Sequence, residues 1–192
     1  MYMRLSVTKV LEAYRRGYFP MADPQTGRIW WFSPDPRAVL PLAEFHVPRS
    51  VARLVRRSVF EVYHDRAFDA VVAACADRSE SWLSKELQAV YRELYRVGHA
   101  HSVECWQEGQ LVGGLFGIAI GGAFFGESMF HRVTGASKVA LVHLVTHLRW
   151  RGFRLLDIQF LTPHFLQFGA EEISRHLFEK QLAEALALPV HW

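Results

Sequence analysis

Residues 101–130 constrain the fold most, because their apolar residues repeat with a period of two and turn signals divide them. Strands are predicted at 101–107, 110–119 and 123–130. Glu108-Gly109 and Gly121-Gly122 separate these strands, and both dipeptides are typical of tight β-hairpins. The five glycines between residues 111 and 122 make this apolar run unsuitable as a membrane helix, and no other run could span a bilayer. An antiparallel meander is therefore expected at the centre of a sheet.

Helical periodicity on both sides of the meander indicates helices that cover this sheet. Before the meander, helices are predicted at 8–16, after Pro48 with Ser50 as N-cap, at 68–75, and at 84–98 with Ser84 as N-cap. Short strands are predicted at 37–42 and 60–64. After the meander, the pattern predicts a helix from a Ser137 cap to Gly152, a strand at 154–160, a helical turn at 163–168, a strand at 169–173 and a helix at 175–186. This order indicates an α/β (α+β) fold with a mixed sheet flanked by helices, the layout of the N-acetyltransferase-like (acyl-CoA N-acyltransferase) core.

Residues 18–35 contain three prolines and Gly27, and we expect an irregular loop there. Trp30, Trp31 and Phe32 would be costly to leave in water, so this loop must pack on the rest of the chain. We expect a small N-terminal domain at 1–36 and a larger domain at 37–192.

The positive charge is concentrated at the front of the chain. Residues 1–57 carry a net charge of +6 and residues 58–192 a net charge of −3. Arg49, Arg53, Arg56 and Arg57 fall on one face of the predicted helix after Pro48. Guanidinium groups match phosphate oxygens, so these four arginines are candidates for binding RNA, although such a face is also typical of an ordinary solvated helix.

Three polar residues lie within otherwise apolar strands. Asp157 and Gln159 are two residues apart in a predicted strand, so we expect their side chains to share one face with Leu155. Glu127 lies among phenylalanines and methionine in another strand. Each is either a hydrogen-bonded core residue or a site group, and the functional interpretation is a polar pair that orients an amine nucleophile. Trp82, on a polar loop, either stacks on a base or anchors that loop.

Several kinds of chemistry are not supported by the residue pattern. The ten histidines lack neighbouring cysteines or carboxylates at metal-ligand spacing, so no metal site is predicted. Ser128 and Ser137 lack a nucleophile-elbow motif. Cys75 and Cys105 have apolar neighbours, and we expect buried reduced thiols in a cytosolic protein. No secretory signal precedes Val10.

Eight stretches of the chain carry a resemblance to one family and follow one another in that family's order. They are residues 13–20, 31–40, 98–104, 111–114, 126–130 (Gly-Glu-Ser-Met-Phe), 136–138, 157–159 (Asp-Ile-Gln) and 166–175, and they span nearly the whole chain. In these stretches the chain resembles the leucyl/phenylalanyl-tRNA–protein transferases.

The resemblance implies an aminoacyltransferase of the N-degron pathway, and with it the roles of individual residues. It would move Leu or Phe, and sometimes Met, from the 3′ end of aminoacyl-tRNA to proteins that begin with Arg or Lys. The implied enzyme is a cytoplasmic protein, expected to be a monomer, that needs no metal or cofactor. Asp157 and Gln159 take the catalytic positions, and Trp82 matches a tryptophan that meets the terminal adenosine. The positions around the amino-acid side chain are Leu115, Phe124, Glu127, Met129, Leu141, Leu144 and Leu148.

Two departures from the family and two rival functions accompany this interpretation. The chain begins at the family's first helix without the usual Gly-rich lead-in, so we expect either a short variant with a shortened N-terminal domain or a trimmed start. Met21 stands where many members have tryptophan. A CoA-dependent acetyltransferase would need an R/Q-x-x-G-x-G/A loop, and residues 132–137 contain only Gly135. A non-catalytic RNA-binding module would leave Asp157 and Gln159 unexplained.

Overall fold

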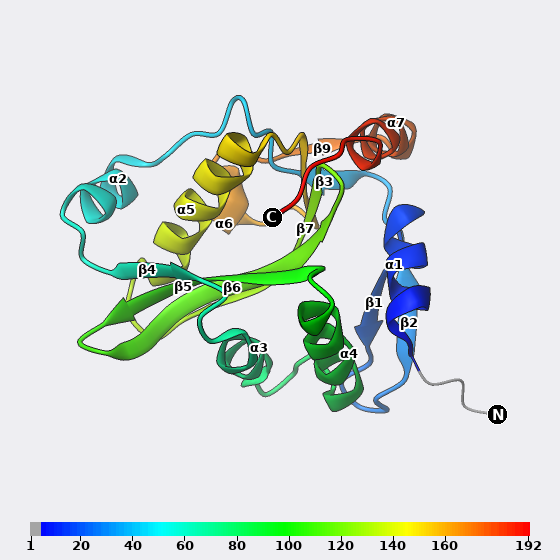
Figure 1. The fold of residues 1–192 in the computed structure, drawn as a ribbon, viewed down its shortest axis with the longest axis horizontal. Helices are drawn as coiled ribbons and strands as arrows, with labels where there is room; N and C mark the ends of the chain where they lie inside the picture. The colour runs from blue at the N-terminus through cyan, green and yellow to red at the C-terminus, as the bar shows by residue number, and fades with distance from the viewer. Residues whose placement is uncertain (1–4) are drawn as a thin grey trace.

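The computed structural model describes residues 5–192 and contains a mixed seven-stranded sheet with helices on both faces (Figure 1). The strand order is β4-β5-β6-β7-β8-β3-β9. The strands of this sheet are β3 (Arg37–Val39), β4 (Glu61–His64), β5 (Ala100–Gln107), β6 (Gln110–Ile120), β7 (Ala123–His131), β8 (Leu155–Gln159) and β9 (Glu171–Ile173). The helices are α1 (Val7–Arg15), α2 (Arg49–Arg56), α3 (Phe68–Ala76), α4 (Lys85–Arg96), α5 (Ala136–Arg151), α6 (Pro163–Leu166) and α7 (Arg175–Leu186).

The predicted meander is confirmed, because β5, β6 and β7 pair in antiparallel order as two successive hairpins. Glu108 and Gly109 both have positive φ, at 51° and 73°, as the two central residues of a type I′ turn require. The meander separates two helical layers: α3 and α4 pack below the sheet in Figure 1 and α5 packs above it.

A β-bulge and a short parallel pairing open the sheet between β7 and β8. Gly117 pairs with Gly126 and Phe116 pairs with Ser128, so Glu127 is the extra residue of the bulge. The parallel pairing of β7 with β8 covers only residues 123–125 and 155–157. Beyond that point the two strands no longer pair, and this gap positions the site described below.

Helix α5 packs directly on the sheet, although its N-terminus is not built as predicted. A Cβ on Gly113 would lie 2.4 Å from Ala136 Cβ, so only glycine lets the first turn of α5 approach β6 this closely. The predicted Ser137 cap is wrong: Gly135 precedes the helix with φ of 90°, and Ser137 lies inside it. The predicted stop at Gly152 is confirmed.

Of the other two predicted N-caps, the one at Ser84 is confirmed and the one at Ser50 is wrong. Ser84 caps α4 by accepting a hydrogen bond from the Leu87 N–H. Ser50 does not cap α2, because the helix already begins at Arg49, directly after Pro48. Pro48 fixes the backbone before the helix but offers no side-chain acceptor, so the start of α2 has no side-chain cap.

The irregular loop predicted at residues 18–35 is instead a two-stranded hairpin of β1 (Phe19–Ala22) and β2 (Ile29–Phe32). Its turn is stabilised by Asp23 Oδ1, which accepts hydrogen bonds from the N–H groups of Gln25 and Thr26. The prolines that suggested a loop are tolerated because each strand lies at the edge of this small sheet. The division of the chain after residue 36 stays a prediction.

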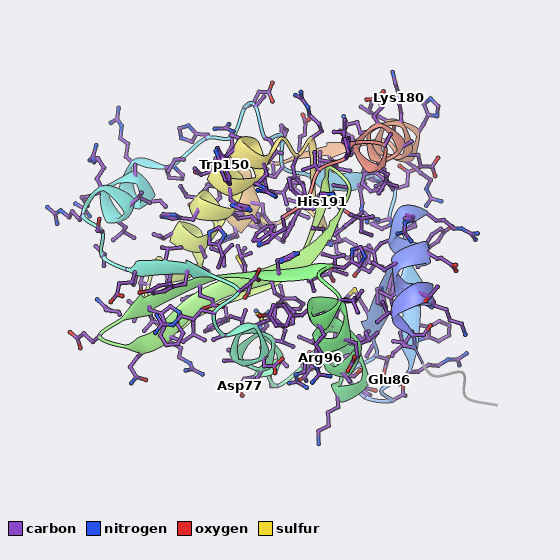
Figure 2. All side chains as sticks on the ribbon, in the orientation of Figure 1. Asp77, Glu86, Arg96, Trp150, Lys180 and His191 are labelled. Carbon is purple, nitrogen blue, oxygen red and sulfur yellow. The ribbon has the colours of Figure 1, made fainter. Side chains whose placement is uncertain are left out.

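The side chains in Figure 2 fill the space between the layers, and both cysteines are buried and unpaired as expected. Trp150, labelled on α5, is 77% exposed. The expectation that Trp30, Trp31 and Phe32 are withdrawn from water is wrong, because they are 47%, 39% and 39% exposed. The N-terminal hairpin packs on the rest of the chain through Phe19 and Ala22 instead, which are buried. Among residues 5–192, no helix is both long enough and apolar enough to cross a membrane.

Candidate active site

A cavity of about 200 Å³ lies where β7 and β8 diverge. Its walls come from both diverging strands, from the inner face of α5 and from the loop before α4. The lining residues are Arg78, Trp82, Leu115, Phe116, Gly126, Glu127, Ser128, Met129, Leu141, Leu144, Leu156, Ile158, Gln159 and Phe165. Most of these side chains are apolar. The polar ones are Glu127 and Ser128 at the bulge, Gln159 at the end of β8 and Arg78 in the loop before α4.

The structure brings together most of the residues predicted to surround a donor amino acid. Those in the lining are Leu115, Glu127, Met129, Leu141 and Leu144. Trp82, predicted to meet the terminal adenosine, and Gln159, predicted to be catalytic, line the same cavity. Phe124 and Leu148 are fully buried and lie outside the lining, in the apolar cluster that also contains Leu144. The other lining residues were not predicted, because only the folded chain shows which side chains border a hollow. They are Arg78, Phe116, Gly126, Ser128, Leu156, Ile158 and Phe165.

Asp157 and Gln159 do not share a face as predicted. Gln159 lines the cavity together with Leu156 and Ile158, which were expected on the opposite face. The cause is backbone conformation: Gln159 has φ of 61°, which interrupts the alternation of a β-strand at that residue. Asp157 has no exposed surface and is absent from the lining.

Asp157 instead forms a buried ion pair that holds this backbone in place. Its Oδ2 accepts from Arg37 Nη2 at 2.6 Å, and its Oδ1 accepts from Arg37 Nε at 2.9 Å. The same Oδ1 also accepts from the backbone N–H of Gln159 at 2.9 Å. Arg37 is only 1% exposed, and its Nη1 donates to the Gly17 carbonyl. The pair therefore links β3, the chain after α1 and the bend at Gln159.

Glu127 ends a chain of hydrogen bonds that begins at α1. The Tyr91 hydroxyl donates to Glu127 Oε2 at 2.8 Å, and the hydroxyls of Tyr91 and Tyr14 lie 3.1 Å apart. Burial raises the pKa of Glu127 to about 7, and the two tyrosine hydrogen bonds oppose that rise. Burial also raises the pKa values of both tyrosines. This carboxyl group therefore changes its charge near neutral pH.

Two buried polar atoms of cavity residues have no hydrogen-bond partner among residues 5–192. They are Glu127 Oε1 and Gln159 Nε2. An unpaired buried acceptor or donor is costly, and such atoms are usual where a ligand supplies the partner. One acceptor and one donor next to an apolar hollow suit a ligand with an N–H group, a carbonyl and an apolar side chain.

Trp82 borders a second cavity as well as the first. The second cavity, of about 340 Å³, is lined by Met21, Ala22, Asp23, Pro24, Trp30, Phe32, Glu80 and Trp82. The backbone N–H of Ala22, at the end of β1, donates to the Trp82 carbonyl. The N-terminal hairpin therefore forms one wall of the second cavity, and Trp82 separates the two hollows.

The four arginines proposed to bind RNA do not enter either cavity. They are exposed on α2 and at Arg57 directly after it. α2 packs against α5, since a Cβ on Gly135 would meet Leu54 at 2.4 Å. Within residues 5–192, no group of three or more His, Cys, Asp or Glu side chains is arranged to hold a metal ion.

Comparison with known proteins gives first a class and then a family. A GCN5-related glucosamine N-acetyltransferase region from a fungal β-N-acetylglucosaminidase superposes with a TM-score of 0.53, covering 90% of this chain and 22% of that one at 9% identity. That likeness shows an N-acetyltransferase-like fold for this chain. Sequence profiles described as leucyl/phenylalanyl-tRNA protein transferase match residues 39–183, and its N-terminal domain matches residues 3–35. The chain belongs to the leucyl/phenylalanyl-tRNA–protein transferase family.

Two relatives support this assignment over nearly the full length. The leucyl/phenylalanyl-tRNA–protein transferase of Salinibacter ruber is 54% identical over 183 residues, which are 95% of this chain and 81% of the relative. That of Gloeobacter violaceus is 50% identical over 189 residues, which are 98% of each chain.

Proposed function

We propose that this enzyme transfers Leu or Phe, and less readily Met, from aminoacyl-tRNA to the N-terminus of proteins that begin with Arg or Lys. The observation that carries the proposal is the position of Trp82 between an apolar cavity and an aromatic-lined one. An aminoacyl-adenosine consists of an apolar side chain and a base joined through one ribose ester. The two adjoining hollows suit those two parts.

The first cavity accepts the donor's side chain by shape. Its volume of about 200 Å³ lies below the range of about 300–1,000 Å³ typical of drug-sized ligands, and suits one amino-acid side chain. Leu115, Met129, Leu141 and Leu144 form apolar walls that accept unbranched or γ-branched chains. A methylene group changes selectivity by only about 10–200-fold, so some transfer of Met is expected. A bulkier residue at Met129 should reduce transfer of Phe before that of Leu.

The second cavity accepts the terminal adenine. Base–aromatic stacking needs flat aromatic faces, and Trp30, Phe32 and Trp82 supply them. Met21, which replaces the family's frequent tryptophan, lies in this same cavity. The proposal therefore assigns the stacking role to the neighbouring aromatic residues.

The polar groups orient the two reactants. The acceptor's neutral α-amine attacks the ester carbonyl carbon, the bond to the ribose 3′-oxygen breaks, and the amine's proton leaves with that oxygen. Gln159 accepts a hydrogen bond from the attacking amine through its carbonyl oxygen and donates from Nε2 to the ester carbonyl. The Glu127 carboxylate holds an amino group of the bound substrate. Holding both reactants in this way lowers the barrier by on the order of 7–11 kcal/mol.

Asp157 acts in this proposal as a positioning residue. It has no surface on the cavity, and it contacts the backbone N–H of the residue that does. The α2 arginines bind tRNA phosphates at a distance from the reacting centre, which gives tRNA affinity that weakens with salt. We place the reaction in the bacterial cytoplasm, where charged tRNA and newly exposed N-termini coexist.

A transfer assay tests the proposal directly. Radiolabelled Leu-tRNA is mixed with a peptide that begins with Arg, and labelled peptide is the expected product. Gln159→Ala should lower kcat about 100–1,000-fold, because a group that stabilises the transition state is lost. Gln110→Ala, at the exposed start of β6, is the matched control and should retain full activity.

The same assay separates the rival functions. Acetylation of the peptide from acetyl-CoA, without Leu transfer, would support a CoA-dependent enzyme. Binding of tRNA with no transfer of any amino acid would support an RNA-binding module. Either result would refute the proposed aminoacyl transfer.

A further inference from the structure

The first cavity, proposed above to hold the donor's side chain, is called the donor cavity from here on. Phe124 and Leu148 form a second layer of side chains behind it. The Phe124 ring covers Gly117, where a Cβ would meet its Cε1 at 2.3 Å. Gly117 is two residues from Leu115 on the same face of β6, and Leu115 lines the cavity. Leu148 is one helical turn beyond Leu144, another lining residue. A shift of this second layer would therefore change the depth of the cavity.

Trp192 supports this layer from behind. Its ring stacks on Phe124 with centroids 5.3 Å apart and an interplanar angle of 27°. The same ring lies 4.6 Å from His101 and 4.3 Å from His147. His64 is 5.6 Å away. The half-buried indole therefore packs between α5 and the sheet strands β4, β5 and β7.

The chain segment that carries Trp192 is fixed to the far end of α5. Arg151 Nε donates to the His191 carbonyl at 2.7 Å, and its Nη2 donates to the Trp192 carbonyl at 2.8 Å. Val190 packs beside Gly152, where α5 ends. Figure 1 shows the C-terminal end of the chain beside α5 and β7, well away from the N-terminal hairpin. Trp192 is therefore held by hydrogen bonds to α5 itself, the helix that forms one wall of the donor cavity.

We propose that Trp192 is a positioning residue that determines donor selectivity by holding Phe124, which shares an apolar cluster with Leu148, behind the donor cavity. The inference rests on the proposed function, because it concerns which side chain the enzyme transfers. Removing the indole leaves a space that neighbouring apolar side chains fill only in part. Phe124 and the neighbouring Leu148 then relax into that space, away from the donor cavity, and the cavity becomes deeper. A deeper cavity admits larger apolar donors and loses its preference for leucine.

The test measures selectivity rather than activity alone. Wild type and Trp192→Ala are compared with tRNA charged with Leu, Phe or 2-naphthylalanine, using an Arg-initiated peptide. We expect the ratio of kcat/KM for naphthylalanine to that for Leu to rise roughly tenfold or more in Trp192→Ala, the discrimination expected for a few atoms in an apolar pocket. Trp192→Phe, which keeps a stacking ring, should return the ratio to within about threefold of wild type.

Trp150→Ala is the matched control, since Trp150 lies on the same helix and is mostly exposed. Its ratio should equal that of wild type. If Trp192→Ala does not fold, Phe124→Leu in the intact background tests the same layer and should raise the ratio in the same direction. An unchanged ratio in the folded variants overturns the inference. Absence of Leu transfer by wild type would instead refute the proposed function, so the two failures are distinct.

Discussion

Replacing Asp157 by Asn should lower stability strongly, because the substitution leaves a buried guanidinium without its counter-ion. The carboxylate accepts three hydrogen bonds: two from Arg37 and one from the Gln159 N–H. An asparagine side chain offers one acceptor oxygen, and its NH₂ group would then face a second N–H donor. With Arg37 only 1% exposed, water cannot replace the lost partner.

The expected magnitude follows from this geometry. Removing one partner of a buried ion pair costs about 3–5 kcal/mol. In a chain of this size, each kcal/mol moves Tm by about 2–4 °C, so Asp157→Asn should melt roughly 6–20 °C lower than wild type. Circular dichroism melting at constant pH measures the shift. Asp69→Asn is the matched control, since Asp69 is 68% exposed and pairs with Arg92 at the surface, and its Tm should move by no more than about 4 °C.

Two further measurements complete the test of Asp157. The double variant Arg37→Met/Asp157→Leu should recover much of the lost Tm, because it removes both buried charges. At a temperature well below its Tm, Asp157→Asn should also show a lower kcat with the Kd for Leu-tRNA nearly unchanged, since Asp157 positions Gln159 and does not touch the tRNA. A Tm within about 2 °C of wild type for Asp157→Asn, or a strongly weakened Kd, would refute this reasoning.

Three other results are expected. Burial raises the pKa of Glu127 to about 7. If the ionised Glu127 holds an amino group of the substrate, the ratio of wild-type to Glu127→Gln activity should therefore fall as pH drops through about 7. A ratio independent of pH would contradict that role. Burial lowers the pKa of His147 to about 4 from its usual value near 6.5, so the unfolded chain binds the proton first and the folded state should lose stability as pH falls from about 6.5 toward 4. In urea melts, the unfolding free energy of His147→Phe should depend less on pH than that of wild type. Parallel curves for the two proteins would exclude a contribution of His147. Replacing the three arginines of α2 and the adjacent Arg57 by glutamine should reduce the slope of log Kd for Leu-tRNA against log salt concentration by about 0.7–0.9 for each phosphate that the protein no longer neutralises, and an unchanged slope would place tRNA binding elsewhere.

Local patterns were sufficient for most of the fold. The period of two and the Glu108-Gly109 turn determine the meander, because side-chain alternation and positive φ at the turn act within a few residues. Helix α7 runs from Arg175 to Leu186 as predicted, with its cap at Ser174. The hairpin at residues 19–32 was missed because its prolines and its short strands resemble a loop, and only pairing across the turn stabilises it.

The site was predictable as a set of residue types but not as a geometry. The polar residues Glu127, Asp157 and Gln159 stood out in the sequence because charge and amide groups are rare in apolar strands. Which of these side chains reach the cavity could not be predicted, because it depends on a bulge at Glu127 and on positive φ at Gln159. Strand alternation alone placed Asp157 and Gln159 together, and the backbone bend separates them.

By itself the sequence determined the order of strands and helices, the apolar faces that pack, and the few polar residues available for chemistry, because these follow from side-chain type and local periodicity. Tertiary structure alone decided that Arg37 neutralises Asp157 across 120 residues of chain, that Trp82 borders two cavities and that Trp192 stacks on Phe124. The physical reason is that burial, ion pairing and cavity shape depend on contacts between distant segments, which no local pattern encodes.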